Sequence, residues 1–223
     1  MTTNSHRTLI TSLLSTLPFI LANSAQAHAQ AQEAHSHGPV AVSASKLVQT
    51  DATLRDLWLG HAFWTRAVSA ELLSGNEPAA AAAEEQAVAN ARQLSQAMAA
   101  FYGSAASEQV FKLLAGHYGA VKQYTLATRA HSAQTQDAAR QAMVKNAEEI
   151  AVFLSSANPN LPIDGLRGML LAHGGHHMQQ IQQLADRQYT QEAQTWGAMK
   201  DHMYGIADAL TLAIAKQFPK RFD

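Results

Sequence analysis

The sequence predicts an all-α fold, an antiparallel helical bundle of about six helices. Apolar residues recur at intervals of three and four from about residue 51 to the C-terminus, and no run alternates between apolar and polar residues as a half-buried strand would. Glycine and proline are sparse and fall between the periodic segments. The chain has no cysteine, so the apolar core must supply the stability without disulfides.

Residues 1–29 are expected to be a signal peptide. A charged start is followed by an apolar stretch, Thr8–Ala22, and then by small and polar residues. The stretch contains Pro18 and is shorter than the roughly 20 residues that a membrane span needs, although an uncleaved anchor is the alternative. Two A-x-A sites compete, with cleavage after Ala27 or after Ala29. The mature protein is expected to be secreted, periplasmic in a double-membrane bacterium, and without a membrane span.

Residues 30–50 are expected to be a flexible leader. Ala, Gln, Ser and His dominate this segment, Gly38-Pro39 interrupts it, and His35 and His37 lie in it as weak, exposed metal ligands. The helical-bundle domain is expected to occupy residues 51–223. That length suits one domain with a full core.

Six periodic segments of the domain are the expected helices, at about residues 51–74, 78–101, 105–131, 137–156, 163–187 and 190–217. The first carries an apolar stripe from Leu54 to Leu72, with spacings of four and three. Gly75 fits its C-terminal end, and Pro78 fits the first turn of the second helix. Gly103 separates the second helix from the third.

The later segments carry stripes of their own. The run Asn158–Pro162 contains two prolines and breaks the pattern between the fourth and fifth helices. No glycine or proline marks the break between the last two helices. Short connections between segments of similar length predict antiparallel neighbours, and no repeat is evident in the sequence.

Charge balance and missing signatures argue against several function classes. The chain has 16 Lys and Arg against 17 Asp and Glu, without a basic cluster, so nucleic acid is not an expected partner. No Glu-x-x-His occurs, which argues against a di-iron bundle, and nucleophile-elbow, P-loop and Rossmann patterns are missing too. No general base stands out, so the sequence favours a binding protein, and a metal-dependent enzyme remains as the last alternative. The oligomeric state stays open.

Four histidines lie in or beside the apolar stripes, near the middle of their helices. His61, His117 and His173 lie inside the stripes of the first, third and fifth helices, and His202 lies beside that of the sixth. Mid-helix positions share one level of an antiparallel bundle, so the four imidazoles are expected to meet in one core layer. A buried imidazole needs a partner for its polar atoms, and a bound cation would serve all four. The histidines predict a metal site, with hydrogen-bonded core histidines as the alternative interpretation.

Further candidate ligands lie near this layer. His177 follows His173 by four residues, so one helix face presents two imidazoles to one ion. The thioethers of Met169, Met199 and Met203 lie close to the same histidines along the chain and would favour copper, although methionines at helical spacing are also ordinary core filler. The expected cofactor is a transition metal, copper or zinc, with haem b held by two histidines as the alternative.

Another set of residues offers an alternative kind of site, and its members are Trp58, Trp64, Arg66, Asn146 and Asp208. Arg66 is expected to pair with Asp208 or with another acid near the end of the bundle. With the histidines, the side chains expected to line a cavity for a small organic ligand or a partner helix are Trp58, Trp64, Tyr124 and Asn146. Two functions therefore stay open. One is a periplasmic bundle that stores, senses or delivers a transition metal, and the other is a module that binds a small molecule or a protein and has structural core histidines.

Several motifs of the domain carry a resemblance, among them Leu57-Trp58-x-x-His61-x-x-Trp64-Thr65-Arg66, Phe153-Leu154-Ser155-Ser156-Ala157-Asn158-Pro159-Asn160 and Lys216-Gln217-Phe218-Pro219-x-Arg221-Phe222. Over about residues 54–222 the chain resembles a family of small bacterial helical-bundle proteins for which no activity is established. The resemblance implies a helical fold, and its pattern includes the positions of His61, His117, His173 and His202. Some relatives carry the labels acetylglutamate kinase or glycosyltransferase, and nothing in this glycine-poor helical sequence supports either.

Overall fold

The structure, a computed structural model, describes residues 45–223, and the predicted all-α fold is confirmed there. This part of the chain contains no strand, and its helices are α1 (Lys46–Ser74), α2 (Glu77–Tyr102), α3 (Ser104–Arg129), α4 (Ala133–Ala157), α5 (Ile163–Ala185), α6 (Tyr189–Gln217) and the short 3₁₀ helix η1 (Pro219–Arg221). The predicted signal peptide and residues 30–44 of the predicted leader lie outside the described residues. Residues 46–50, also assigned to the leader, belong to α1 instead.

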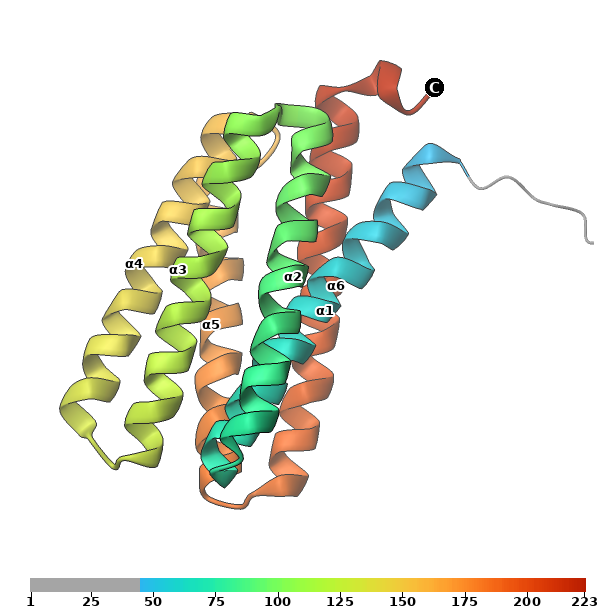
Figure 1. Cartoon of the computed structure of the whole chain (residues 1–223). Helices are drawn as coiled ribbons and strands as arrows, with labels where there is room; N and C mark the ends of the chain where they lie inside the picture. Colours follow the sequence, from blue (N-terminus) through green and yellow to red (C-terminus); the bar gives the residue numbers. More distant parts are fainter. Residues whose placement is uncertain (1–44) are drawn as a thin grey trace, which may run out of the picture. The chain divides into compact units, whose positions relative to one another are not determined.

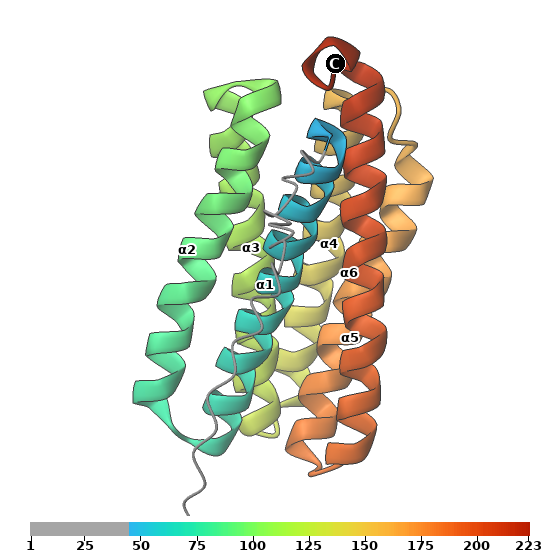
Figure 2. The same cartoon turned by 90° about the vertical axis from the view of Figure 1, so that its right-hand side faces the viewer.

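The six α-helices form three antiparallel hairpins, α1–α2, α3–α4 and α5–α6, around a common axis (Figure 1). Helices α1, α3 and α5 contact one another in all three combinations, so three helices of the same direction form the inner part of the bundle. Helices α2, α4 and α6 pack outside them. Helix α6 also contacts α1, and Figure 2 shows α1 between α2 and α6.

The three hairpins are equivalent in structure, at an interval of 56 residues. The same interval separates Ser69 from Thr125, two equivalent residues whose hydroxyl groups share a hydrogen bond of 3.0 Å between α1 and α3. The first helix of each hairpin ends at a residue in the left-handed conformation, and these residues are Gly75, His131 and Arg187, with φ of 78°, 53° and 58°. The structure therefore contains a repeat of position, although no repeat is evident in the sequence.

A second recurring feature links the two helices of each hairpin. A side-chain N–H on the second helix donates to a backbone carbonyl 33 residues earlier on the first helix, and the pairs are Asn90 with Leu57, Asn146 with Leu113, and His202 with Met169. Only a few of the equivalent residues are identical, because the hairpins share geometry more than side chains. That is why the repeat escapes a reading of the sequence.

The connection between α5 and α6 shows how a turn forms without glycine. Arg187 takes the left-handed conformation that Gly75 takes in the first hairpin. The Gln188 N–H donates to the Gln183 carbonyl at 2.8 Å, and the Arg187 N–H donates to the Leu184 carbonyl at 3.2 Å. These bonds close the end of the helix as in a glycine-terminated helix. The break predicted between the last two helices is confirmed.

The core changes character along the bundle axis. At the end that holds the α2–α3 connection, one large apolar cluster includes the stacked rings of Phe101 and Phe222. Toward the α1–α2 turn the apolar clusters are smaller, and buried polar side chains appear among them: Thr65, Ser69, Thr125, Gln180 and Glu192. The buried histidines lie between these two regions.

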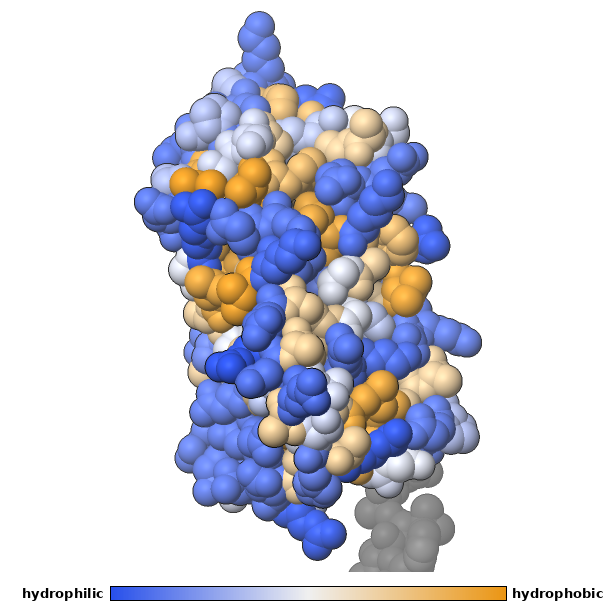
Figure 3. All heavy atoms as spheres, turned by 90° about the vertical axis from the view of Figure 1, so that its left-hand side faces the viewer, coloured by the Kyte–Doolittle hydropathy of each residue, from blue (hydrophilic) through white to orange (hydrophobic). Residues whose placement is uncertain are grey.

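The surface is mixed in character. On the face that α4 contributes to, apolar side chains stand separately among polar ones, as is usual for a globular protein (Figure 3). Among the described helices, none combines the length and the apolarity that crossing a bilayer requires.

Candidate metal centre

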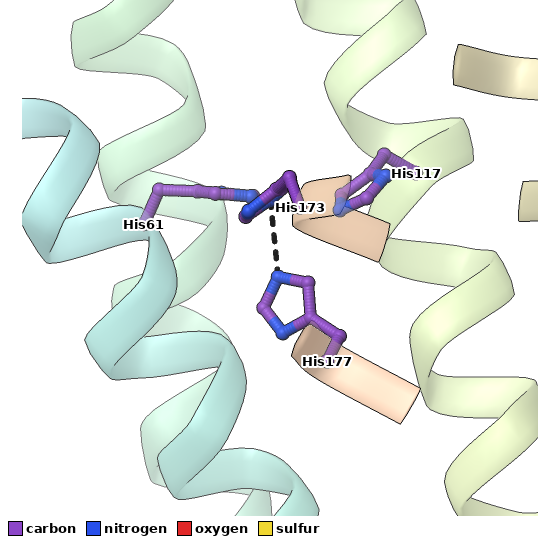
Figure 4. A group of neighbouring side chains, drawn as sticks. All are labelled: His61, His117, His173 and His177. Carbon is purple, nitrogen blue, oxygen red and sulfur yellow. Dashed lines mark hydrogen bonds between the residues drawn. The ribbon is translucent and has the colours of Figure 1, made fainter. Parts of the chain in front are cut away.

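Three of the predicted histidines occupy equivalent positions of the three hairpins. His61, His117 and His173 lie on α1, α3 and α5, and their side chains converge (Figure 4). Their ring centroids form a nearly equilateral triangle with sides of 5.5, 5.6 and 5.1 Å. Because the inner helices run in the same direction, equivalent positions along them lie at one level. The structure thus brings these three imidazoles into one layer.

The fourth member of the group is His177, which lies one helical turn after His173 on α5. The Nε2 atoms of these two residues are 3.1 Å apart, the dashed line of Figure 4. The group offers one ligand nitrogen from each residue, all within 4.8 Å of one another, and its members are His61, His117, His173 and His177. The positions equivalent to His177 hold Thr65 and Val121. The third hairpin alone therefore supplies a second imidazole.

His202 does not belong to this group, which corrects the expectation that it shares the layer. It is partly exposed, and its Nε2 donates to the Met169 carbonyl at 2.8 Å. This bond is the one that Asn90 and Asn146 make in the other hairpins. The physical reason is its location, because α6 is an outer helix and its side chains meet α5 before they reach the axis.

Burial keeps the four histidines in the neutral form. Each exposes between 2 and 4% of its surface. Desolvation, with a smaller contribution from His117, lowers the pKa of His61 to about 3, and desolvation lowers that of His117 to about 4. Desolvation and the neighbouring imidazoles lower the pKa values of His173 and His177 well below the ordinary value. Near neutral pH each ring therefore has a lone pair available to a metal, without first losing a proton.

Several ring nitrogens of the group lack a partner. His61 Nε2, His117 Nε2 and His173 Nδ1 are buried without a hydrogen bond. An unsatisfied buried polar atom costs roughly 1–3 kcal/mol. Histidines retained only for core hydrogen bonds would have these atoms paired. A cation among the four rings would instead satisfy the lone Nε2 atoms of His61 and His117.

A small cavity adjoins the triangle of rings on the side away from His177. Its volume is about 10 Å³, and Trp58, Leu114 and Leu170 line it together with the three equivalent histidines. These three residues are themselves equivalent, each three residues before its histidine. The volume corresponds to about one water-sized sphere. The space beside the histidines therefore suits a single ion or water and is too small for an organic molecule.

Arg66 pairs with Glu192, and Asp208 pairs elsewhere. Both Arg66–Glu192 contacts are 2.6 Å, and the buried carboxylate also accepts from Gln180 Nε2 at 3.0 Å. Burial raises the pKa of Glu192. The hydrogen bond and charge of Arg66, together with the hydrogen bond from Gln180, lower this pKa by more than burial raises it, so the net shift is downward. Asp208 instead binds both Nε and Nη2 of Arg55, at 2.7 and 2.8 Å.

Sequence reasoning missed Glu192 and Gln180. Glu192 looks like an ordinary acid in the first turn of α6, yet its equivalents Ala80 and Gln136 lie on the side of α2 and α4 that packs against the inner helices. The 56-residue interval would have shown that Glu192 points inward.

The remaining predicted residues make contacts of other kinds. Trp64 packs against Phe63 with centroids 4.9 Å apart, beside a surface pocket. Asn146 is buried, and its side-chain N–H donates a hydrogen bond to the Leu113 carbonyl. The three predicted methionines belong to the large apolar cluster or pack against it: Met169, Met199 and Met203.

The fold and the site together define a bundle of three equivalent helical hairpins with a buried four-histidine group at its axis. Comparison of the chain with protein-family models, curated proteins and solved structures finds no match. The functional argument therefore rests on the geometry of this site, and the family resemblance stays a prediction.

Proposed function

We propose that the protein binds one transition-metal ion through His61, His117, His173 and His177. The observation that carries this proposal is the set of four neutral imidazoles whose ligand nitrogens lie within 4.8 Å of one another. In a tetrahedral site with metal–nitrogen distances of about 2.0–2.1 Å, the nitrogens lie about 3.3 Å apart. The Nε2 atoms of His173 and His177 are already 3.1 Å apart, in a hydrogen bond whose proton would move to the other ring nitrogen when both bind the ion. The remaining ligand nitrogens lie within 4.8 Å and would move closer around the ion.

Copper and zinc are the proposed metals, because imidazole suits both. The group supplies no negative charge, and Glu192, a buried carboxylate toward the polar end of the bundle, is already paired with Arg66. Burying an ion costs more free energy as its charge rises. Neutral ligands therefore favour cuprous ion over a divalent ion. The small cavity argues against haem at these histidines, since a porphyrin needs far more room than about 10 Å³.

Storage, sensing or delivery fits a site of this kind. Four protein ligands complete the coordination of a tetrahedral ion, whereas a catalytic ion keeps a position for water or substrate. The proposed location is outside the cytoplasm, and it rests on the signal-peptide pattern of residues 1–29.

The alternative, a module for a small organic ligand, has one supporting observation. The surface pocket beside Trp64 has a volume of about 360 Å³, and Phe63 and Trp196 also line it. This volume lies in the range of roughly 300–1,000 Å³ typical of small-molecule sites. Such a ligand would raise the melting temperature, and a chelator would leave that effect unchanged.

The test is equilibrium dialysis of the chelator-treated full chain against Cu⁺ and against Zn²⁺, with the bound metal measured by element analysis. The expected result is about one ion per chain, with tight binding lost in His61→Ala, His117→Ala and His173→Ala. The matched control is His131→Gly, which removes an exposed histidine in favour of the residue at the equivalent position of the first hairpin. Unchanged stoichiometry and affinity in all three alanine variants would sink the proposal.

A further inference from the structure

The internal repeat makes the third hairpin comparable, position by position, with the other two. Besides His173, the third hairpin carries His176, His177 and His202. The position of His176 holds Trp64 and Ala120 in the other hairpins, and that of His202 holds Asn90 and Asn146. Two of these additional histidines, His176 and His202, lie outside the four-histidine group.

His176 and His202 form a pair between α5 and α6. Their ring centroids are 5.5 Å apart, and both residues are partly exposed. Partial burial, and to a smaller extent the charge of His202, lower the pKa of His176. The pair therefore offers two imidazoles at the surface of the bundle, in contrast to the buried group.

The hydrogen bond of His202 prepares its ring to bind a metal. The Met169 carbonyl can only accept, so the Nε2 atom of His202 carries the proton. In the neutral ring the lone pair is then on Nδ1. Metal-bound histidines commonly donate their other ring N–H to a backbone carbonyl in this way. An asparagine at this position makes the same bond but has no ring nitrogen to offer.

The pair of His176 and His202 lies next to the buried four-histidine group. The ring of His202 lies parallel to that of His173, with an angle of 8° and centroids 6.4 Å apart. His173 in turn belongs to the four-histidine group. A line of imidazoles thus runs from the partly exposed His176 and His202, through His173, to the axis.

We propose that His176 and His202 form an entry site that receives the metal ion from outside and passes it through His173 to the buried group. This inference rests on the proposed metal binding. An entry site is needed because the four buried histidines expose too little surface to take up an ion directly from solvent. The ion exchanges one imidazole for the next along this line, so it does not cross the apolar part of the core without a ligand.

The test uses His176→Ala with His202→Asn in one chain, which installs the residues of the second hairpin and keeps an N–H donor for the Met169 carbonyl. Metal-free full chain is mixed with Zn²⁺ carried by a colorimetric chelator, and with Cu⁺ carried by bicinchoninate, and the transfer is followed by absorbance. The expected result is loading slower by at least about tenfold, the lower end of the range over which variants of one site change an association rate. The final stoichiometry should be unchanged, and His131→Gly should load at the rate of the wild-type chain.

The outcomes separate this inference from the proposed function. Unchanged stoichiometry with an unchanged loading rate overturns the entry site alone. Lower stoichiometry in the double variant also overturns it, because the pair would then belong to the final site. Wild-type protein that takes up neither ion at equilibrium overturns both proposals.

Discussion

The third hairpin and the first two share one backbone arrangement but carry different chemistry around the axis. Each contributes one equivalent histidine to the triangle of rings, and only the third adds His177, together with His176 and His202 nearby. The repeat supplies an internal control, because each additional histidine has two equivalents that show what the fold needs there. At these positions the other hairpins hold threonine and valine, tryptophan and alanine, or asparagine, so the fold itself does not require an imidazole there.

The largest expected effect concerns the three equivalent histidines. Replacing any one of them by alanine should weaken metal binding by more than about 100-fold, beyond the 10–100-fold loss typical of removing an outer hydrogen-bond partner. His177→Val, which installs the residue of the second hairpin, should weaken it less, because the symmetric triangle remains. Competition with a chelator of known affinity measures both. Equal losses in all four variants would mean that the triangle has no special role.

The pH dependence of the free energy of unfolding should report the neutral, buried state of the four histidines. A buried histidine stays neutral while its unfolded counterpart binds a proton, so the metal-free protein should lose stability as the pH falls below about 6.5, toward the pKa of about 3 of His61 and about 4 of His117. Each buried histidine contributes about 1.4 kcal/mol per pH unit in this window. Urea unfolding between about pH 7.5 and pH 5 gives the slope.

The same series contains its control. His117→Leu should reduce that slope by about 1.4 kcal/mol per pH unit relative to the wild-type chain. A slope that is the same with and without His117 would show that this ring is charged in the folded protein.

A close contact between a glycine on α1 or α3 and an asparagine on the partner helix should distinguish the first two hairpins from the third. A Cβ at Gly60 would lie 2.8 Å from Asn90 Nδ2, and one at Gly116 would lie 3.0 Å from Asn146 Nδ2. Gly60→Ala should therefore cost about 1 kcal/mol in free energy of unfolding, after the gain in helix propensity is subtracted from the overpacking penalty. Gly116→Ala should cost less.

Two other positions check this explanation. Gly119→Ala has open space around the new Cβ and should stabilise by up to about 1 kcal/mol. In the third hairpin the equivalent position already holds Ala172, beside His202 in place of asparagine. Denaturant unfolding of the variants measures all these effects, and a stabilising Gly60→Ala would show that Asn90 moves aside at no cost.

The smallest expected effect concerns His202 itself. His202→Asn should change the free energy of unfolding by less than about 0.5 kcal/mol, because asparagine makes the same bond in the other hairpins. His202→Ala should cost about 1 kcal/mol, since the Met169 carbonyl loses its donor. Thermal unfolding of the metal-free variants tests this pair. Equal losses in both would mean that the ring packs in a way that asparagine does not reproduce.

Part of the site was predictable from the sequence, and the errors have a common cause. The mid-helix positions of His61, His117 and His173 predicted one layer, and the prediction is correct for these three because their helices are the inner ones. His202 is central in its helix too, but that helix is an outer one, so the same reasoning failed. Arg66 forms an ion pair with an acidic residue, as expected. That residue is Glu192 and not Asp208, because the packing of α6 against α1 brings Glu192 next to Arg66.

The sequence by itself determined the helices, their boundaries within a few residues and the absence of disulfides, because periodicity, caps and composition act over short distances along the chain. It also determined which rings are available as ligands. The four-residue spacing from His173 likewise predicted that His177 lies with the other rings, as it does. Only the tertiary structure decided that α1, α3 and α5 are the inner helices, that three hairpins repeat around an axis, and that His202 stays near the surface. These outcomes depend on which faces of distant helices pack together, and side-chain spacing along one helix does not encode that choice.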